Sequence, residues 1–530
     1  MVVGTDTKRS DEKGEDIQHV QTATMAQTML DPYGPSGNIH FVNLHISDTD
    51  QLYSGFRGII LSRYVVLCAA FSAIGGILFG YDSHSQGVIS VTLVMPQFLE
   101  RFPEVSEKAS GGGFYKGLMT GMIELGALIG ALNQGWIADK ISRRYSIIVA
   151  VIIFTLGSSL QTASVNYPML VAARFIGGVG IGMLSMVVPL YISEISPPEI
   201  RGSLLVFEEF SIAVGIVEIC LWQLPFALQI IPGLLLGIGA FIFLPFSPRW
   251  LAAKGREDEA LAVLAKLRML PSTDARVLRE WMDIIAESTF QKQVLEERHP
   301  ELVAKTRTNR LKLEIRTHIG AGLMFFQQFV GINALIYYSP TMFSVLNITQ
   351  LIGVISSLWT LDRSGRKSIL LWGSVEMFIS HFIISILAGL YSSDWPSHRP
   401  EGWIGVALLL FYMLSFGASW GPVPWAMPAE IFPSSLRAKG VAISTCSNWL
   451  NNFIIGLVTP PLVQKTGFGA YVFLAVFCLG SFAWTYLCVP ETNGKTLKQM
   501  DEVFKDRGNA EAVEKKEVIF LQIVRRMENR

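Results

Sequence analysis

The sequence has few charged residues and no excess of either sign. Only 16% of its 530 residues are Asp, Glu, Lys or Arg, and 43 acidic residues balance 43 basic ones. A net charge of zero argues against a nucleic-acid partner, because proteins that bind nucleic acids concentrate positive charge. Half of the residues are hydrophobic and 11% are aromatic. This composition is typical of a protein that crosses a lipid bilayer many times.

Cysteine is scarce and shows no metal-binding or redox spacing. The chain also has no phosphate loop, no cluster of metal ligands and no nucleophile motif, which argues against an enzyme. Residues 1–55 are polar and of mixed charge, so no cleavable signal sequence is expected there. The cysteines lie in or beside apolar runs and are predicted to be free core thiols: Cys68, Cys220, Cys446, Cys478 and Cys488.

Apolar runs long enough to be membrane spans divide the chain into two groups. Twelve are predicted, at 63–95, 114–137, 145–163, 168–192, 203–222, 224–245, 318–341, 345–361, 368–391, 403–427, 439–461 and 468–489. We therefore expect an all-α polytopic membrane protein. Its parts are a disordered N-terminal tail (1–55), a first domain (56–251), a linker (252–316), a second domain (317–490) and a C-terminal tail (491–530). The linker is charged, and its helical apolar spacing predicts amphipathic helices on the membrane surface.

Loop charges predict the orientation of the chain in the membrane, and internal repeats indicate its architecture. Lys and Arg gather in the loops after even-numbered spans, which predicts that these loops and both termini are cytoplasmic. The loop Asp139–Arg144 is repeated 223 residues later as Asp362–Lys367, and Glu194–Arg201 is repeated 236 residues later as Glu430–Arg437. Parallel repeats of six spans are typical of one transporter architecture.

The seventh predicted span contains unusual amide side chains. Gln327, Gln328 and Asn333 lie in an apolar run, where unsatisfied amides are costly. Gln328 and Asn333 would point roughly 140° apart on a regular helix, but Gly331 between them allows a bend. Amides both donate and accept, so they suit the hydroxyls of a polyol. A polyol site and simple helix–helix contacts both fit this stretch.

Short motifs occur through both halves in a specific order. They are Gly80–Asp82, Asp139–Arg144, Arg174 before a glycine-rich run, Glu194–Arg201, Ser247–Leu251, Gln327–Asn333, Asp362–Lys367, Gly421–Trp425, Pro428–Pro433 and Pro490–Gly494. From about residue 63 to residue 507 the chain resembles the sugar porter family of the major facilitator superfamily, and most of all the fungal monosaccharide transporters. The resemblance implies twelve transmembrane helices in two six-helix pseudo-repeats, joined by cytoplasmic linker helices.

The resemblance also implies a site for one monosaccharide near the midplane of the membrane. Amides would bind the hydroxyls and an indole would cover the apolar face of the ring. The matching positions are Gln327, Gln328, Asn333, Asn347, Trp425, Asn448 and Asn452. Glu209 stands where many members have a sugar-contacting Gln, and its position leaves open whether it lines the cavity.

Asp82 and Arg174 are the candidate proton-coupling pair. Charges inside membrane spans are costly and are usually paired. In proton-coupled members of the family the matching residues form such a pair, and protonation of Asp82 would release Arg174. A static pair that serves only packing is the alternative. The resemblance implies no cofactor, with the proton as coupling ion.

Charged residues of the repeated loops are expected to form a cytoplasmic gate. In the family such pairs act as a latch that holds the outward-facing state; the alternative is that they only orient the protein. The matching positions are Asp139, Arg143, Arg144, Glu194, Arg201, Asp362, Arg366, Glu430 and Arg437.

The chain departs from the family pattern at four places. Ser83–Ser85 are additional after Asp82, and residues are missing near Trp222, Arg316 and Ser344. Mis-set exon boundaries or an impaired paralogue would each account for these joints. The prediction is a monomeric, proton-coupled hexose transporter of the plasma membrane, with glucose as substrate. A sugar sensor of the same fold and a facilitative uniporter are the alternatives.

Overall fold

The part of the chain described by the computed structural model consists of helices and their connections. It comprises residues 62–82, 96–106, 112–197, 200–222, 229–296, 306–333, 335, 343–391, 394–432, 437–492, 518–520 and 522–523. Every regular element in these ranges is an α-helix or a short 3-10 helix. Helices satisfy their backbone groups within one segment, as a chain in lipid requires. The all-α prediction is confirmed.

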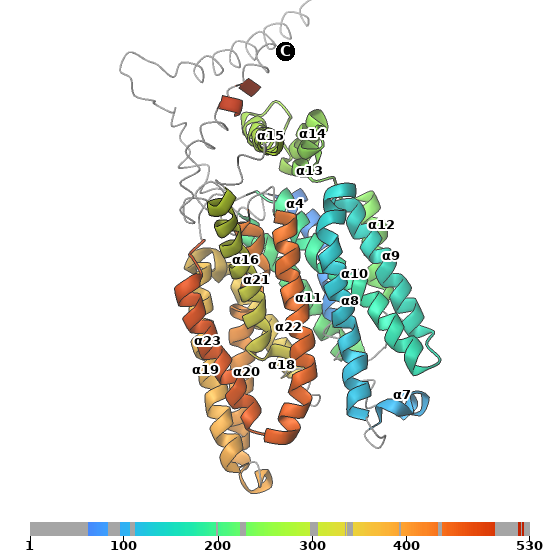
Figure 1. Cartoon of the computed structure of the whole chain (residues 1–530), viewed down its shortest axis with the longest axis vertical. Helices are drawn as coiled ribbons and strands as arrows, with labels where there is room; N and C mark the ends of the chain where they lie inside the picture. Colours follow the sequence, from blue (N-terminus) through green and yellow to red (C-terminus); the bar gives the residue numbers. More distant parts are fainter. Residues whose placement is uncertain are drawn as a thin grey trace, which may run out of the picture.

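The first bundle surrounds one deeply buried helix, α10 (Tyr167–Ile195). Figure 1 shows it among its neighbours, and α8 and α9 make the most extensive contacts with it. The other helices of this bundle are α4 (Arg63–Ser72), α5 (Ile74–Asp82), α8 (Gly112–Ile141), α9 (Arg143–Thr162), α11 (Arg201–Trp222) and α12 (Ile230–Ile242). A short outer segment contains α7 (Pro96–Arg101) and the 3-10 helix Pro103–Val105.

Glycines let α8 and α10 approach closely. A Cβ atom on Gly182 would lie 1.9 Å from the carbonyl oxygen of Ala127, and one on Gly126 would lie 2.2 Å from that of Phe175. Neither position has space for a side chain. The glycine-rich run after Arg174 is therefore required by the packing of the first bundle.

The second bundle is built from the residues after the linker. Its helices are α16 (Thr306–Phe329), α18 (Phe343–Ser364), α19 (Arg366–Tyr391), α20 (Arg399–Ala418), α21 (Pro422–Ile431), α22 (Arg437–Thr466) and α23 (Gly469–Cys488), with a 3-10 turn at Trp395–Ser397. Helix α16 runs without interruption through the predicted boundary between linker and second domain, so no helix end marks that boundary.

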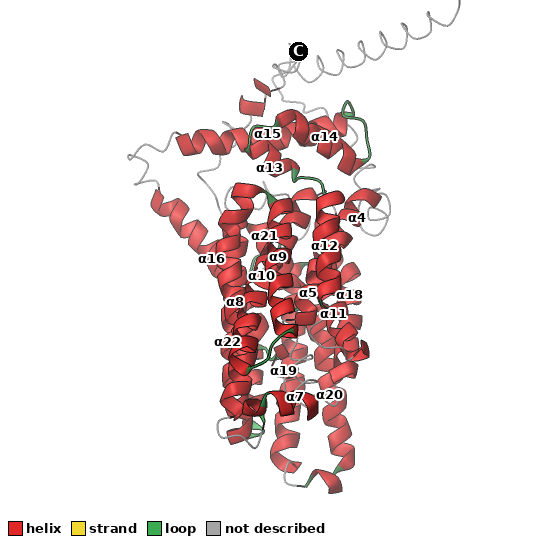
Figure 2. Cartoon of the chain, turned by 90° about the vertical axis from the view of Figure 1, so that its right-hand side faces the viewer, coloured by secondary structure: helices red, strands yellow, loops and turns green. Residues whose placement is uncertain are grey.

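The two bundles meet mainly through two helix pairs. Helix α8 packs against α22, and α11 packs against α18. Figures 1 and 2 both show α8 and α22 side by side along most of their length. Since α8 and α11 belong to the first bundle and α18 and α22 to the second, residues between these pairs are contributed by both halves of the chain.

The linker forms a small helical layer at one end of the bundles, as Figure 2 shows for α13 (Pro248–Ala253), α14 (Glu257–Arg268) and α15 (Ala275–Glu296). Leu251, Leu264 and Trp281 belong to the core of this layer. Helix α14 has acidic residues in its first turn and basic residues in its last, which complements the helix dipole. The Arg268 guanidinium donates to the carbonyl oxygen of Ile195 at 3.0 Å. The layer is therefore attached to the C-terminal end of α10.

The lengths of the apolar helices bear on the predicted departures from the family pattern. Within the described ranges, six helical segments are long and apolar enough to span a bilayer, and three apolar helices are shorter. Each of the twelve predicted spans overlaps a described helix. Helix α12 has only 13 residues, about 20 Å against a hydrocarbon core of about 30 Å. Residues 223–228 lie outside the described residues, so the predicted compression near Trp222 stays a prediction. Helix α18, with 22 residues, is longer than the 17 predicted.

Candidate functional site

The amide-rich segment of α16 lies at a break in the helix. Helix α16 ends at Phe329, and Gly331 has a φ of 107°, in the region that favours glycine. The break leaves the carbonyl oxygen of Val330 outside the regular ladder. The Tyr412 hydroxyl donates to it at 3.0 Å, and Nε2 of His381 lies 3.1 Å away. The bend predicted at Gly331 is confirmed, and two buried side chains of the second bundle stabilise it.

Gln327 ties three helices together. Its Nε2 donates to the carbonyl oxygens of Trp420 and Gly421, both at 2.9 Å, immediately before α21. Its Oε1 accepts from Nδ2 of Asn448 on α22 at 2.7 Å. Both N–H groups of the amide are therefore used, and within the described part of the chain one lone pair of Oε1 remains for a ligand.

A second group of amides surrounds Asn333. Its Nδ2 donates to Oε1 of Gln328 at 2.5 Å and to Oδ1 of Asn452 at 2.6 Å. Nδ2 of Asn452 in turn donates to Oε2 of Glu124 on α8 at 2.9 Å. A regular helix would direct Gln328 and Asn333 apart, so the break at Gly331 is what brings them into contact. The chain of amides crosses from the second bundle to the first.

The remaining candidate sugar contacts are also buried, and each is at most 5% exposed: Glu209, Asn347 and Trp425. Oε1 of Glu209 lies 2.9 Å from where a Cβ atom on Gly421 would stand, so this carboxyl adjoins the backbone that Gln327 holds. Trp425 is one turn further along α21. Asn347 is on α18, which packs against α11, the helix of Glu209.

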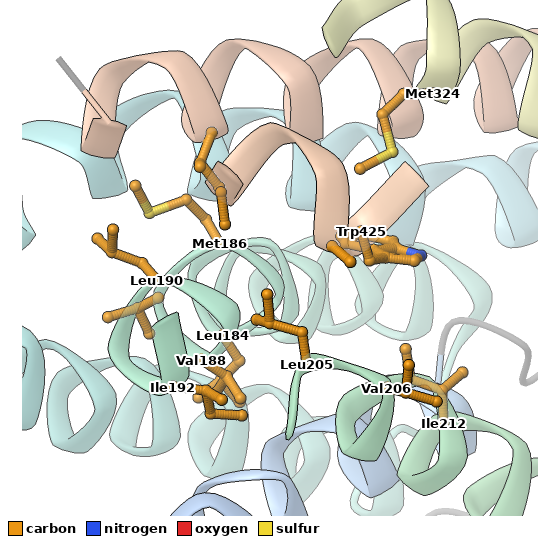
Figure 3. Packing of buried hydrophobic residues seen from close by; sticks show 14 of the residues in the cluster. Leu184, Met186, Val188, Leu190, Ile192, Leu205, Val206, Ile212, Met324 and Trp425 are labelled. Carbon is orange, nitrogen blue, oxygen red and sulfur yellow. The ribbon is translucent and has the colours of Figure 1, made fainter. Parts of the chain in front are cut away.

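Apolar residues of both bundles form one continuous core around these polar groups. Leu205 of α11, Met324 of α16 and Trp425 of α21 all belong to it (Figure 3). The low dielectric of such surroundings strengthens hydrogen bonds to a bound ligand and makes unpaired polar groups costly. The candidate site is thus a set of amides in an apolar environment between two bundles.

Of the two residues of the proposed proton-coupling pair, the structure describes the side chain of one. Arg174 is fully buried on α10, and its Nε donates to the carbonyl oxygen of Met119 at 2.7 Å. Asp82 is the last residue of α5, but its side chain lies outside the described residues. The pairing of Asp82 with Arg174 stays a prediction.

The charged loops form two equivalent ion pairs at the linker end of the bundles. Arg143 lies 2.8 Å from Glu194 in the first bundle, and Arg366 lies 3.0 Å from Glu430 in the second. Each arginine also donates to the carbonyl oxygen five residues before it, at 3.0 Å for Arg143 and 3.2 Å for Arg366. The repeat seen in the sequence is therefore also a repeat of geometry.

Asp139 and Arg144 complete the loop of the first bundle in different ways. Asp139 lies 3.1 Å from Arg143. Burial raises the pKa of the Asp139 carboxyl above its ordinary value, and the charge of Arg143 opposes this shift. Arg144 points elsewhere: its guanidinium donates to the carbonyl oxygen of Phe241 and lies over the ring of Phe246. Arg144 therefore holds the end of α12 and is not part of the ion pair.

The other predicted gate arginines are buried between the two halves. Burial, together with the charge of Arg249, lowers the pKa of the Arg201 guanidinium to about 10 and that of Arg437 to about 9. The carboxylate of Glu430 in the second half opposes the shift at Arg201, and that of Glu194 in the first half opposes the shift at Arg437. Arg201 also donates to the carbonyl oxygen of Ser196 at 3.4 Å. The side chain of Asp362 lies outside the described residues. The acidic residues of the two ion pairs thus interact across the interface between the bundles.

Comparison with known proteins places the chain in a family. Residues 68–504 match the family model described as "Sugar (and other) transporter". The chain belongs to this family. It is a transporter of the major facilitator superfamily and an integral membrane protein with many spans, not an enzyme.

The relatives of the transporter are named for different substrates. It is 31% identical to "MFS glucose transporter mfs1" of Aspergillus flavus, over 83% of this chain and 89% of the relative. It is 30% identical to "Probable quinate permease" of the same organism, over 83% and 88%. The proton:xylose symporter XylE, solved with 6-bromo-6-deoxy-D-glucose, has the same fold with a TM-score of 0.69 at 26% identity, covering 84% of this chain and 99% of XylE.

The structure shows hydrogen-bond partners for two acidic residues of the transporter that the sequence did not predict. Glu491 caps α19: its carboxylate accepts from the backbone N–H groups of Arg366 at 2.9 Å and Lys367 at 3.2 Å. The motif Pro490–Gly494 signalled this residue, although not its partners. Glu124 was visible only as an acid inside an apolar run. Nothing in the sequence indicates its contact with Asn452, 328 residues away.

Proposed function

We propose that the transporter carries a hexose, with glucose as the first candidate, together with a proton, by alternating access of one site to the two sides of the membrane. The observation that carries the proposal is the set of amides between the two bundles. A mechanism in which the bundles rock about a central site needs binding groups from both halves. Gln327, Asn333 and Asn452 come from the second half, and Glu209 comes from the first.

The hydrogen-bonding capacity of the site favours a neutral polyol. Gln327 keeps one acceptor position, and the amide nitrogen of Gln328 is the end of the chain that runs through Asn333. Hydroxyl groups match such mixed donors and acceptors. Trp425 supplies an apolar face for the sugar ring, and a monomer is sufficient because one chain contains both bundles.

A quinate-like substrate is the second candidate, because a relative of nearly equal identity is named for it. Quinate carries a carboxylate, whereas the candidate contacts are amides, an indole and the carboxyl of Glu209, with no basic residue among them. An ionised carboxylate in apolar surroundings is costly without a cationic partner. The candidate contacts therefore favour a neutral sugar over an anion.

Proton coupling is proposed to depend on Asp82 and Arg174. Protonation of the Asp82 carboxyl would weaken its attraction for the guanidinium, and the released Arg174 would allow the first bundle to rearrange. Arg174 is already anchored by the Met119 carbonyl oxygen, so it has a partner in the state without Asp82. A uniporter would need no such titratable group.

The cytoplasmic ion pairs are proposed to be a latch. The linker, both termini and the loops of Arg143 and Arg366 would lie on the cytoplasmic side of the plasma membrane. When the bundles rock toward the inward-open state, the carboxylates of Glu194 and Glu430 would move away from Arg437 and Arg201 of the opposite half. The pairs within each bundle would keep the loops ordered.

Uptake of radiolabelled glucose tests the proposal. The chain is expressed in yeast that lacks its own hexose carriers, and rates are measured at an external pH of about 5 and about 7.5, because the lower pH supplies more of the protons that would drive a symporter. We expect faster uptake at the lower pH, and loss of this difference in Asp82→Asn. Equal rates at both pH values would support a uniporter. Quinate uptake without glucose uptake would reverse the choice of substrate, and surface expression without any uptake would indicate a sensor or an impaired chain.

A further inference from the structure

Glu124 stands at one end of the amide chain and is itself an acid. It lies on α8, is 1% exposed, and accepts through Oε2 from Nδ2 of Asn452. Helices α8 and α22 form the larger of the two contacts between the bundles, so this bond joins the halves beside the amide cluster. No role for Glu124 follows from the motifs or from the proposed transport mechanism.

An ionised carboxylate differs from an amide in that it can only accept hydrogen bonds. An amide can turn over and exchange its donor and acceptor ends at little cost. In a chain of amides each residue therefore follows the orientation of its neighbour. A group that can only accept, placed at one end, fixes the orientation of every amide behind it.

The observed bonds have the orientation that this rule requires. Asn452 presents its nitrogen to Glu124, so its oxygen faces Asn333. Asn333 then presents its nitrogen both to Asn452 and to Gln328. Two groups are not used within the chain of amides: Oδ1 of Asn333, an acceptor, and Nε2 of Gln328, a donor.

The bond between Glu124 and Asn452 has the direction that this rule needs. Oε2 of Glu124 accepts from the amide nitrogen of Asn452 at 2.9 Å. In its ionised form Glu124 has no proton to donate, so this bond cannot reverse while the carboxylate is charged.

We propose that Glu124 is a positioning residue of the sugar site, which fixes the donor and acceptor pattern that Asn333 and Gln328 present to the substrate. The inference rests on the proposed function. With Glu124 in place, one sugar hydroxyl accepts from Gln328 and one donates to Asn333. If the chain were reversed, Gln328 would present its oxygen and Asn333 its nitrogen, and the same two hydroxyls would have to exchange roles.

Fluorinated glucose distinguishes the two patterns, because a C–F group can accept weakly but cannot donate. The experiment measures the KM for glucose and the inhibition constants of the series of monofluoro-deoxy and monodeoxy glucoses in yeast expressing the full chain. Glu124→Gln, Glu124→Gln with Asn452→Asp, and the control Glu376→Gln are compared with the unchanged chain. Glu376 is an acid of α19, a helix that packs against α20 and α23.

For the unchanged chain we expect fluorine to be tolerated at one hydroxyl position and not at another. In Glu124→Gln the new amide can turn over, so the KM should rise roughly tenfold, the worth of one charge-assisted hydrogen bond, and the contrast between the two positions should shrink. In the double variant the carboxylate introduced at position 452 can only accept, so Asn333 must again donate, and both KM and contrast should recover. Glu376→Gln should behave as the unchanged chain.

The outcomes separate this inference from the proposed function. Glucose uptake with a Glu124→Gln variant that keeps its KM and its fluorine contrast would overturn the positioning role and leave the function intact. If the double variant does not recover its KM and its fluorine contrast, the positioning role is also overturned. The carboxylate would then be needed at position 124 itself, and not to orient the chain of amides. Absence of sugar uptake by the unchanged chain would overturn the proposed function, and the inference with it.

Discussion

Gln327 and Gln328 are neighbours of the same chemical type, and the structure predicts that their loss has different consequences. Gln327→Ala removes three hydrogen bonds: those to the carbonyl oxygens of Trp420 and Gly421, and the one from Asn448. Gln328→Ala removes one to the residues that the structure describes, the bond from Asn333. Both glutamines are nearly fully buried, at 3% and 5% exposure. The two variants therefore remove the same side-chain volume from similar surroundings, and the difference between them reports the hydrogen bonds.

The magnitude follows from the number of groups left without a partner. Each buried polar group deprived of its bond costs about 1–3 kcal/mol. We expect Gln327→Ala, which affects three groups, to lower the free energy of unfolding by about 3 kcal/mol or more, and Gln328→Ala, which affects one, by about 1–3 kcal/mol. Thermal unfolding of the purified protein in detergent, monitored by tryptophan fluorescence, shows which of the two variants is less stable. If the proposed sugar site is correct, both variants should raise the KM for sugar, because each removes one of its proposed contacts.

The two measurements together decide whether the reasoning is correct. Equal unfolding temperatures for the two variants would show that the contacts of Gln327 with Trp420, Gly421 and Asn448 do not stabilise the second bundle. A KM that changes only in Gln327→Ala would show that Gln328 does not face the substrate. Either result would contradict the division of roles drawn from the hydrogen bonds.

Two further predictions concern the ion pairs and the packing. Glu430→Gln removes the carboxylate that lies 3.0 Å from the buried Arg366, and loss of one partner of a buried ion pair costs about 3–5 kcal/mol. Hydrogen–deuterium exchange should increase at the start of α19, whereas Glu259→Gln, which removes an exposed pair with Arg256, should leave exchange in the bundles unchanged. Gly182→Val should abolish the folded monodisperse peak in size-exclusion chromatography, because its Cβ atom would overlap the Ala127 carbonyl, while Gly405→Ala, with open space around it, should elute as the unchanged protein.

The helical fold, the two repeats and the types of residue at the site could all be predicted from the amino-acid sequence. Apolar length and loop charge are local properties, so the spans, including the bend at Gly331, needed no knowledge of tertiary contacts. The match between Arg143 and Arg366 could likewise be predicted, because a repeated loop repeats its local bonds to the preceding turn.

Which polar groups satisfy one another was decided by the tertiary structure. The contacts of Gln327 with Gly421, of Asn333 with Asn452, and of Asn452 with Glu124 join residues that are 94, 119 and 328 positions apart. No local pattern encodes such pairings, because they depend on how the two bundles are placed against each other. The separation of Arg144 from the ion pair has the same origin, since its partner Phe241 lies 97 residues away at the end of a neighbouring helix. The direction of the amide chain depends on which residue stands at its end, and that is fixed only when α8 packs against α22.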